Sequence, residues 1–135
     1  MSLKNYHVFI SHSWKYPKPY ETVKRWLDEA NHFIWSDYSV PFYDPLDANT
    51  DRKLKTEIRQ QIASCNCVVI LSGMYVSYSK WINYEIDTAI EMGKPIIGVK
   101  PWGQERIPAK VSENASVIVG WNSASVVQAV RDYSL

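Results

Sequence analysis

The stretch Cys67-Val68-Val69-Ile70-Leu71 decides which fold the sequence predicts. It is continuously apolar and rich in β-branched residues, whereas a strand with one face in water alternates apolar and polar residues. A run of this kind is typical of a strand that is covered on both faces, at the centre of a parallel sheet. We therefore expect an α/β fold in which helices cover both sides of this strand.

Four more short apolar runs are expected to be strands of the same sheet. They are Tyr6–Ile10, a run within Phe33–Phe42, Pro95–Lys100 and Ser116–Trp121. Pro41 marks the second of these runs as an edge strand or as the end of one, because proline cannot donate a hydrogen bond to a sheet ladder.

Helical patterns separate these runs. The expected helices are Pro19–Asn31, a helix capped by Asn49 or Thr50 that ends near Ser64, Lys80–Met92, and a last helix capped by Ser123. Gly93 followed by Pro95 stops the third of them, since glycine suits the end of a helix and proline cannot continue one. The segment Pro101–Ala115 is expected to be a loop with at most one helical turn.

Strands that alternate with helices in this way predict one doubly wound sheet, since crossovers between parallel strands are right-handed. The expected fold class is α/β, a single parallel five-stranded flavodoxin-like sheet in the order 2-1-3-4-5, which fills residues 1–135 as one domain. A ligand then binds at the carboxyl ends of the first and third strands, where the crossover direction reverses. The residues that the topology delivers to this crevice are Ser11, His12, Ser13, Tyr43, Asp44, Ser72 and Tyr75.

The composition narrows the possible partners. The 135 residues carry 15 Lys and Arg against 14 Asp and Glu, so no broad positive surface for nucleic acid or for an anionic membrane is expected. The longest apolar stretch, residues 67–71, is far too short to span a membrane. Cys65 and Cys67 lie too close together to form a disulfide easily, which favours a reducing, cytoplasmic location.

The residues expected in the crevice argue against several kinds of site that this fold can carry. A response-regulator receiver needs acidic residues after its first strand and an aspartate at the end of its third. This chain has Ser11-His12-Ser13 and Ser72-Gly73 at those places. A glycine-rich nucleotide site needs a phosphate loop, and none of the five glycines forms one. No cysteine or histidine spacing indicates a metal site, so we expect no metal.

The third helix contains a carboxylate whose position allows two interpretations. The residues expected to form its core-facing stripe are Ile82, Ile86, Ala89, Ile90 and Gly93. Glu85 lies about a quarter turn from this stripe, over Trp81 and within the first turns of the helix. A glutamate there can simply complement the helix dipole while the tryptophan covers the core. Alternatively, the pair places a carboxylate at the border of the buried face, beneath a large indole.

Several parts of the sequence resemble TIR domains. The stretch Tyr6-His7-Val8-Phe9-Ile10-Ser11-His12-Ser13 resembles the first TIR strand with its Ile-Ser-His end, and Trp81-x-x-x-Glu85 matches a motif of bacterial TIR NADases. The blocks Lys80–Ile86 and Gly93–Val99, with the stretch from Phe33-x-Trp35 to Asp44-Pro45-Leu46, resemble the TIR-like proteins of Thoeris anti-phage defence. The resemblance covers nearly the whole chain, and it implies a TIR-like fold.

The resemblance implies cleavage of the nicotinamide–ribose bond of NAD, with Glu85 as the catalytic carboxylate. NAD is then the substrate, and no cofactor is needed. Nicotinamide leaves as a neutral molecule, so one carboxylate that stabilises an oxocarbenium-like cation suffices. The resemblance also implies that Trp81 stacks on a ring or excludes water, and that the loop Phe42–Asp47 gates the pocket. The expected substrate contacts are the crevice residues named above together with Trp81.

The resemblance also implies partners, and two other functions stay open. ADP-ribose in a linear, cyclic or conjugated form can act as a messenger, so we expect a separate effector protein and self-assembly into a homo-oligomer. One alternative is a non-catalytic TIR-like interaction module that binds a partner through the loop after the second strand or through its helices. The other is a nucleoside deoxyribosyltransferase-like enzyme, which also cleaves a glycosidic bond with one glutamate.

Overall fold

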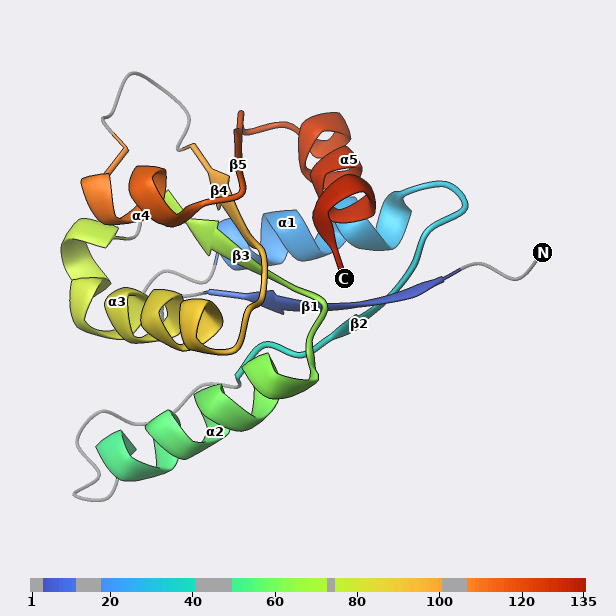
Figure 1. Ribbon diagram of the computed structural model, residues 1–135. Coiled ribbons are helices and arrows are strands. Elements are labelled where there is room, and N and C mark those ends of the chain that lie inside the picture. The colour runs from blue at the N-terminus through green and yellow to red at the C-terminus, as the bar shows by residue number, and fades with distance from the viewer. Residues whose placement is uncertain (1–3, 12–17, 41–49, 73–74, 101–106) are drawn as a thin grey trace.

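The computed structural model describes residues 4–11, 18–40, 50–72, 75–100 and 107–135, with backbone alone for residues 50–51 and 75–79. Strands and helices alternate along the chain (Figure 1). They are β1 (Asn5–Ile10), α1 (Lys18–Glu29), β2 (Ile34–Asp37), α2 (Thr50–Ser64), β3 (Cys67–Leu71), α3 (Tyr75–Glu91), β4 (Ile96–Val99), α4 (Ala109–Asn114), β5 (Val117–Val119) and α5 (Ser123–Tyr133). Within the described ranges, no helix combines the length and the apolar character needed to cross a membrane.

The strands form one parallel sheet in the order β2-β1-β3-β4-β5, which confirms the predicted topology. β3 is central and all of its residues are buried, which explains its continuously apolar sequence. Val8 of β1 pairs with Asp37 of β2 and with Cys67 of β3, and Val69 of β3 pairs with Ile97 of β4. The crossover direction therefore reverses between β1 and β3, where the sequence predicted the ligand crevice.

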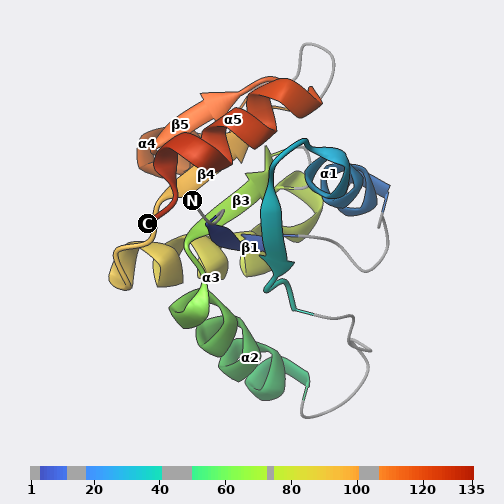
Figure 2. The same cartoon turned by 90° about the vertical axis from the view of Figure 1, so that its right-hand side faces the viewer.

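Two layers of helices cover the sheet, with α1 and α5 on one face and α2, α3 and α4 on the other (Figure 2). Alternate residues of a strand point to opposite faces. Val69 and Leu71 of β3 therefore pack with α1 and α5, whereas Val68 and Ile70 pack with the other three helices. Each face of the sheet has a hydrophobic core of its own.

α4 lies where the sequence predicted a loop with at most one helical turn. It buries a single residue, Val111, and one buried residue leaves little periodicity to detect. The helix is packed closely on β4, which explains the glycine in that strand. A Cβ atom on Gly98 would lie 3.0 Å from Cγ1 of Val111.

Two predicted helix limits need correction. α3 begins at Tyr75, five residues before the predicted start at Lys80. Gly93 follows the end of this helix in the left-handed region, with φ of 67°, which confirms the predicted stop signal. α1 ends at Glu29, two residues earlier than predicted.

The predicted cap of the last helix is also wrong. Asn122 caps α5, because its side-chain Oδ1 accepts a hydrogen bond from the Ser125 amide at 2.8 Å. Ser123, the predicted cap, is the first helical residue. Both types of side chain are good caps, so residue type alone cannot choose between neighbours.

Candidate active site

Two of the predicted crevice residues, Ser11 and Ser72, lie at the carboxyl edge of the sheet, and both are buried. Ser11 Oγ accepts a hydrogen bond from the Leu71 amide at 3.1 Å, and Ser72 Oγ donates one to the Val99 carbonyl at 2.7 Å. Each hydroxyl group thus links the end of one strand to the next strand. A hydroxyl has one donor and two acceptor positions, so these bonds do not use up either side chain. Their contact with a substrate stays a prediction.

A second group of polar residues at this edge was not predicted. Ser39 Oγ accepts a hydrogen bond from the Ile10 amide at 2.9 Å, which links the end of β2 to β1. Asp37 accepts one from the Ser39 amide at 2.8 Å and another from the Tyr20 hydroxyl of α1. Burial and the Asp37 carboxylate raise the pKa of Tyr20, so its hydroxyl stays protonated. The available signal was Asp37-x-Ser39, because aspartate often accepts from the amide two residues on.

Several predicted substrate contacts lie outside the described residues. These contacts are His12, Ser13, Tyr43 and Asp44, and the expected gate Phe42–Asp47 lies outside as well. Tyr75 is described only by its backbone, as the first residue of α3. In the chain, these residues follow β1, β2 and β3, so the described residues supply only part of the expected crevice.

The predicted catalytic residue, Glu85, is buried. It is 6% exposed, and no hydrogen-bond partner for its Oε2 atom is found in the part of the chain that the structure describes. Removal from water raises the pKa of this carboxyl group from 4.5 to about 8. Most buried polar atoms in folded proteins are hydrogen-bonded, so this one requires an explanation. A carboxyl group with a strongly raised pKa is a candidate functional group.

The position of Glu85 in α3 makes the helix-dipole interpretation wrong. Because α3 begins at Tyr75, Glu85 lies in the third turn of the helix, and the first turn contains no acidic residue. The helix dipole acts on charges mainly within the first turn. A favourable dipole therefore does not account for a carboxylate at this place.

The buried face of α3 is rotated relative to the predicted stripe. The residues of the stripe that are buried are Ile82, Ile86 and Ala89. Ile90 is 49% exposed and Gly93 lies beyond the helix, so the prediction is wrong for both. Glu85 and Thr88 occupy the buried face instead. The Thr88 hydroxyl donates to the Tyr84 carbonyl at 2.7 Å, which allows its burial, whereas Glu85 Oε2 has no comparable partner among the described residues.

Trp81 lies one turn before Glu85 and packs, partly buried, against the core cluster of α2 and α3. Its ring meets the Tyr84 ring edge-on, with 6.5 Å between the centroids, and the Lys80 Nζ atom lies 4.9 Å from its centroid. Trp81 is therefore a packing residue in the structure. Its stacking on a substrate ring stays a prediction.

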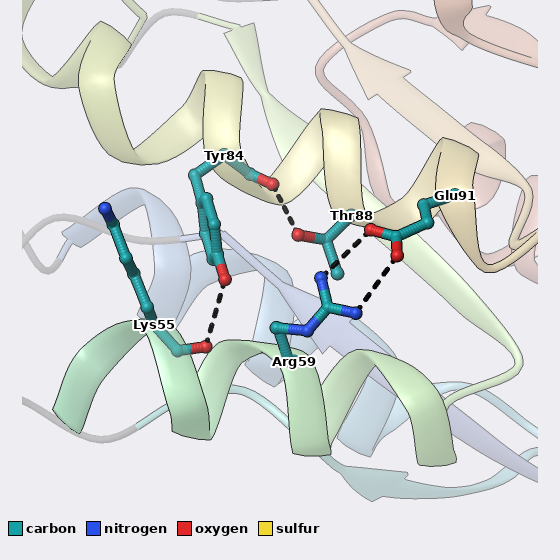
Figure 3. Close-up of polar contacts among 5 residues, drawn as sticks. All are labelled: Lys55, Arg59, Tyr84, Thr88 and Glu91. Carbon is teal, nitrogen blue, oxygen red and sulfur yellow. Dashed lines mark hydrogen bonds and ion pairs between the residues drawn. The ribbon is translucent and has the colours of Figure 1, made fainter. Parts of the chain in front are cut away.

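α2 lies alongside α3 and is joined to it by polar contacts (Figure 3). Arg59 of α2 donates two hydrogen bonds to the carboxylate of Glu91, at 2.9 and 3.1 Å. The Tyr84 hydroxyl donates to the Lys55 carbonyl at 3.4 Å, and the Lys55 Nζ atom lies 5.7 Å from the Tyr84 ring centroid. These contacts join the helix that carries Glu85 to its neighbour.

The described residues supply no cluster for metal binding. Across the described ranges, no three His, Cys, Asp or Glu side chains gather in one place. Cys65 and Cys67 are free and buried, and burial raises the pKa of their thiols to about 12 and about 11. Thiols in this state are poor nucleophiles and poor metal ligands, because both roles require the thiolate.

Comparison with protein-family models identifies the relationship that the sequence suggested. Residues 9–106, more than half of the chain, match the model of the Thoeris protein ThsB, TIR-like domain. The chain belongs to the ThsB TIR-like family. The matched range includes Ser11, Ser72, Trp81 and Glu85. Among curated proteins, none matches this ThsB TIR-like chain.

Comparison with solved structures finds proteins similar to this ThsB TIR-like chain. The Clostridium botulinum CMP N-glycosidase BcmB matches with a TM-score of 0.58 and 21% sequence identity, covering 94% of this chain and 99% of its own. A 3-dehydroquinate dehydratase-like protein from Bifidobacterium longum has a TM-score of 0.49 and 12% identity, with coverages of 96% and 94%. The first of these similarities agrees with the parallel α/β fold described above.

The arrangement in this ThsB TIR-like chain suits chemistry that involves a positive charge. Where water is excluded, a carboxylate interacts strongly with a cation, and no solvent competes for it. With its pKa of about 8, Glu85 is mostly protonated at neutral pH unless a positive charge faces it. A carboxylate in such surroundings can act on a cationic group or on a cation that develops during a reaction.

Proposed function

We propose that the protein cleaves the N-glycosidic bond between nicotinamide and ribose in NAD, with Glu85 as the catalytic carboxylate. The burial of Glu85, with an Oε2 atom that lacks a partner among the described residues, supports this proposal most directly. Such an oxygen is available to bind a ribose hydroxyl group or a positive charge.

The proposed reaction needs only one carboxylate. Nicotinamide is a cationic pyridinium in NAD, and when the bond to C1′ breaks, the electron pair leaves with nicotinamide, which departs as a neutral molecule. C1′ takes on oxocarbenium character, which the ionised Glu85 stabilises. Water or the hydroxyl group of a second nucleophile then attacks C1′, and its proton passes to the solvent. Ordinary glycosides have poorer leaving groups, so the enzymes that cleave them use a pair of carboxyl groups.

The raised pKa of Glu85 agrees with a cationic substrate. Without a substrate, the buried carboxyl group is mostly protonated at neutral pH. The pyridinium ring of NAD brings a positive charge to the site, and a nearby cation favours the carboxylate and lowers its pKa. An uncharged nucleoside brings no such charge, so this argument favours NAD.

Family membership and a shared fold give further support. The match to the ThsB TIR-like family includes the Trp81-x-x-x-Glu85 motif, which resembles that of bacterial TIR NADases. The CMP N-glycosidase that shares the fold is named for cleavage of the same type of bond. The fold alone does not determine the substrate.

The remaining parts of the proposal concern the substrate contacts and the partners. We propose that Trp81 walls the site and that the other contacts are Ser11, His12, Ser13, Tyr43, Asp44, Ser72 and Tyr75. The product, a form of ADP-ribose, would signal to a separate effector protein in Thoeris anti-phage defence. The chain would act in the cytoplasm as a homo-oligomer.

The decisive experiment compares nicotinamide release from NAD by wild-type protein, Glu85→Gln and Asp87→Asn. Asp87 is a matched control, because it is a carboxylate on the same helix with a side chain that is 61% exposed. We expect Glu85→Gln to lower the rate by roughly a hundredfold or more and Asp87→Asn to leave it within about twofold. The assay is run over a series of protein concentrations to allow self-assembly. Equal rates for wild type and Glu85→Gln would discard the proposal.

Two alternatives predict different results in related assays. Release of a base from CMP or from deoxynucleosides, with NAD left intact, would select a nucleoside-type N-glycosidase, which the shared fold of the CMP N-glycosidase favours. Binding of a protein partner that survives Glu85→Gln but is lost on substitution of Phe42 or Tyr43 would select a non-catalytic interaction module.

A further inference from the structure

Glu85 lies on α3 between the flank that contacts α2 and the buried face of the helix. Tyr84 and Glu91, which both contact α2, lie on one flank of α3, because residues seven apart in a helix nearly align. Glu85 is about 100° from Tyr84, toward the core. Asp87 lies about 160° from Glu85 on the helix, and it contacts Lys110 of α4 at 2.6 Å. The ion pair with α4 is therefore nearly opposite to Glu85.

α2 excludes water from the Glu85 side of α3 by its buried residues. Leu54 and Ile58 of α2 are 4% and 2% exposed. They belong to the same core cluster as Ile82 and Ile86, which lie beside Glu85 on the core side of α3. If α2 moved away from α3, this side of the helix would face water.

Nearer to the solvent, polar contacts hold α2 on α3 (Figure 3). The Arg59 guanidinium and the Glu91 carboxylate form a two-bond pair, and such a pair has a defined geometry. Tyr84 and Lys55 add one longer hydrogen bond and a contact between the Lys55 ammonium and the ring. The Arg59–Glu91 pair therefore has the shortest hydrogen bonds that Figure 3 shows between these helices.

We propose that Arg59, through its pair with Glu91, is a positioning residue that keeps α2 closed over Glu85 and so keeps the Glu85 carboxyl group out of water. The consequence for catalysis rests on the proposed function, whereas the consequence for burial does not. If α2 loosens, water reaches Glu85 and weakens its interaction with the positive charge that develops in the transition state. The chemical step then slows, so kcat falls while KM changes little.

The surroundings of Glu85 make burial the main influence on its titration. The sheet below it is apolar, with Phe9, Val68, Ile70 and Ile96 in the same core cluster. Among the described residues, the charged and titratable groups that join α2, α3 and α4 include Lys55, Arg59, Tyr84, Asp87, Glu91 and Lys110. These groups contact one another, and burial is the cause of the raised pKa of Glu85.

The test measures how much Glu85 contributes to the pH dependence of stability. Its pKa is higher in the folded than in the unfolded protein, so the wild type loses stability relative to Glu85→Gln as the pH rises toward 8. From about pH 5.5 to about pH 7.5, the unfolding constant of the wild type divided by that of Glu85→Gln is expected to rise roughly a hundredfold. With Arg59→Gln present in both proteins, water at Glu85 is expected to reduce this change to about tenfold or less.

Lys110→Gln supplies the matched control. It also removes an ion pair of α3, the one that joins Asp87 to α4 on the side nearly opposite to Glu85. The pH-dependent change in the ratio of unfolding constants is therefore expected to keep its full size in the Lys110→Gln background. Arg59→Glu combined with Glu91→Arg restores the pair in reverse and is expected to restore the pH change. Glu91→Gln replaces Arg59→Gln if that protein does not fold.

The outcomes of this test are independent of the NAD assay. The inference would be overturned if the ratio of unfolding constants kept its full pH dependence in the Arg59→Gln background. It would also be overturned if this pH dependence were reduced equally in the Lys110→Gln background. If Glu85→Gln cleaves NAD as fast as the wild type does, the proposed function fails and the stability measurement still decides this inference. If instead the NAD assay supports the role of Glu85 but Arg59→Gln leaves kcat and the pH change intact, only the inference fails.

Discussion

Ser11 Oγ takes the place of a main-chain carbonyl and accepts the hydrogen bond of the Leu71 amide at 3.1 Å. The bond before it is an ordinary main-chain one, from the Ser11 amide to the Val69 carbonyl at 2.9 Å. In the part of the chain that the structure describes, the bonds between β1 and β3 thus include one to a side chain. This bond occurs where the crossover direction reverses.

Replacement of Ser11 by alanine is expected to destabilise the protein by about 1–3 kcal/mol, because the Leu71 amide is left buried without its acceptor. Urea unfolding measures the effect. Ser36→Ala is the control, since the Ser36 hydroxyl bonds to Asn5 at the exposed surface, and we expect a loss below about 0.5 kcal/mol there. Equal losses for the two variants would contradict the linking role of Ser11.

The stability of the wild-type protein is expected to fall as the pH rises from about 5 to about 8. Glu85 has a pKa of about 8 when folded and 4.5 as its ordinary value, so in this interval the unfolded chain releases a proton that the folded protein keeps. The slope attributable to Glu85 is at most about 1.4 kcal/mol per pH unit. Thermal unfolding of wild type and Glu85→Gln across this range checks it, and parallel curves would contradict the burial of an uncharged carboxyl group.

Two isoleucines on α3 test which face of the helix is buried. Ile86→Ala is expected to cost about 2–5 kcal/mol, because Ile86 is fully buried and its loss leaves a cavity. Ile90→Ala is expected to change the free energy of unfolding by less than about 0.5 kcal/mol, since Ile90 is half exposed. Denaturant unfolding of both variants would reveal a large cost at Ile90 if the stripe predicted from the sequence were correct.

The start of α5 can be tested in the same way. Asn122→Ala removes the side-chain acceptor of the Ser125 amide and is expected to cost about 1 kcal/mol. Ser123→Ala is expected to cost at most a few tenths of a kcal/mol, because Ser123 lies inside the helix and alanine is the better helix former. Comparison of their melting temperatures distinguishes the two caps, and a larger effect at Ser123 would contradict the structure.

The sheet could be predicted from the sequence because its signals are local and agree with one another. The apolar run at residues 67–71 identifies a strand covered on both faces, and alternation with helices leaves few possible orders. The Ser11 and Ser72 positions followed directly, since residues after parallel strands meet at one edge. Their bonds to Leu71 and Val99 did not follow, because they depend on how far neighbouring strands separate.

The buried face of α3 was predicted less well. A pattern of apolar residues shows which side chains favour burial, but it does not show what packs against the helix. Ile90 fits the pattern but faces water, whereas Glu85 and Thr88 interrupt the pattern and are buried. Burial also depends on what packs against the helix, and α2, which contacts α3 through Arg59 and Glu91, comes from a different segment of the chain. The start of the helix was missed as well, because residues 75–79 include valine, serine and tyrosine, which are weak helix formers.

The division of the interior by the sheet has a consequence for how substitutions combine. Val69 and Leu71 belong to one core and Val68 and Ile70 to the other, so neighbours in the same strand report on separate compartments. A destabilising substitution in the core between α1 and α5 is expected to lower the amount of folded protein and to leave the pKa of Glu85 unchanged. A substitution of the same cost between α2 and α3 is expected to change both the amount of folded protein and the pKa of Glu85. The two cores can thus be modified separately, which offers a way to strengthen this protein without touching its chemistry.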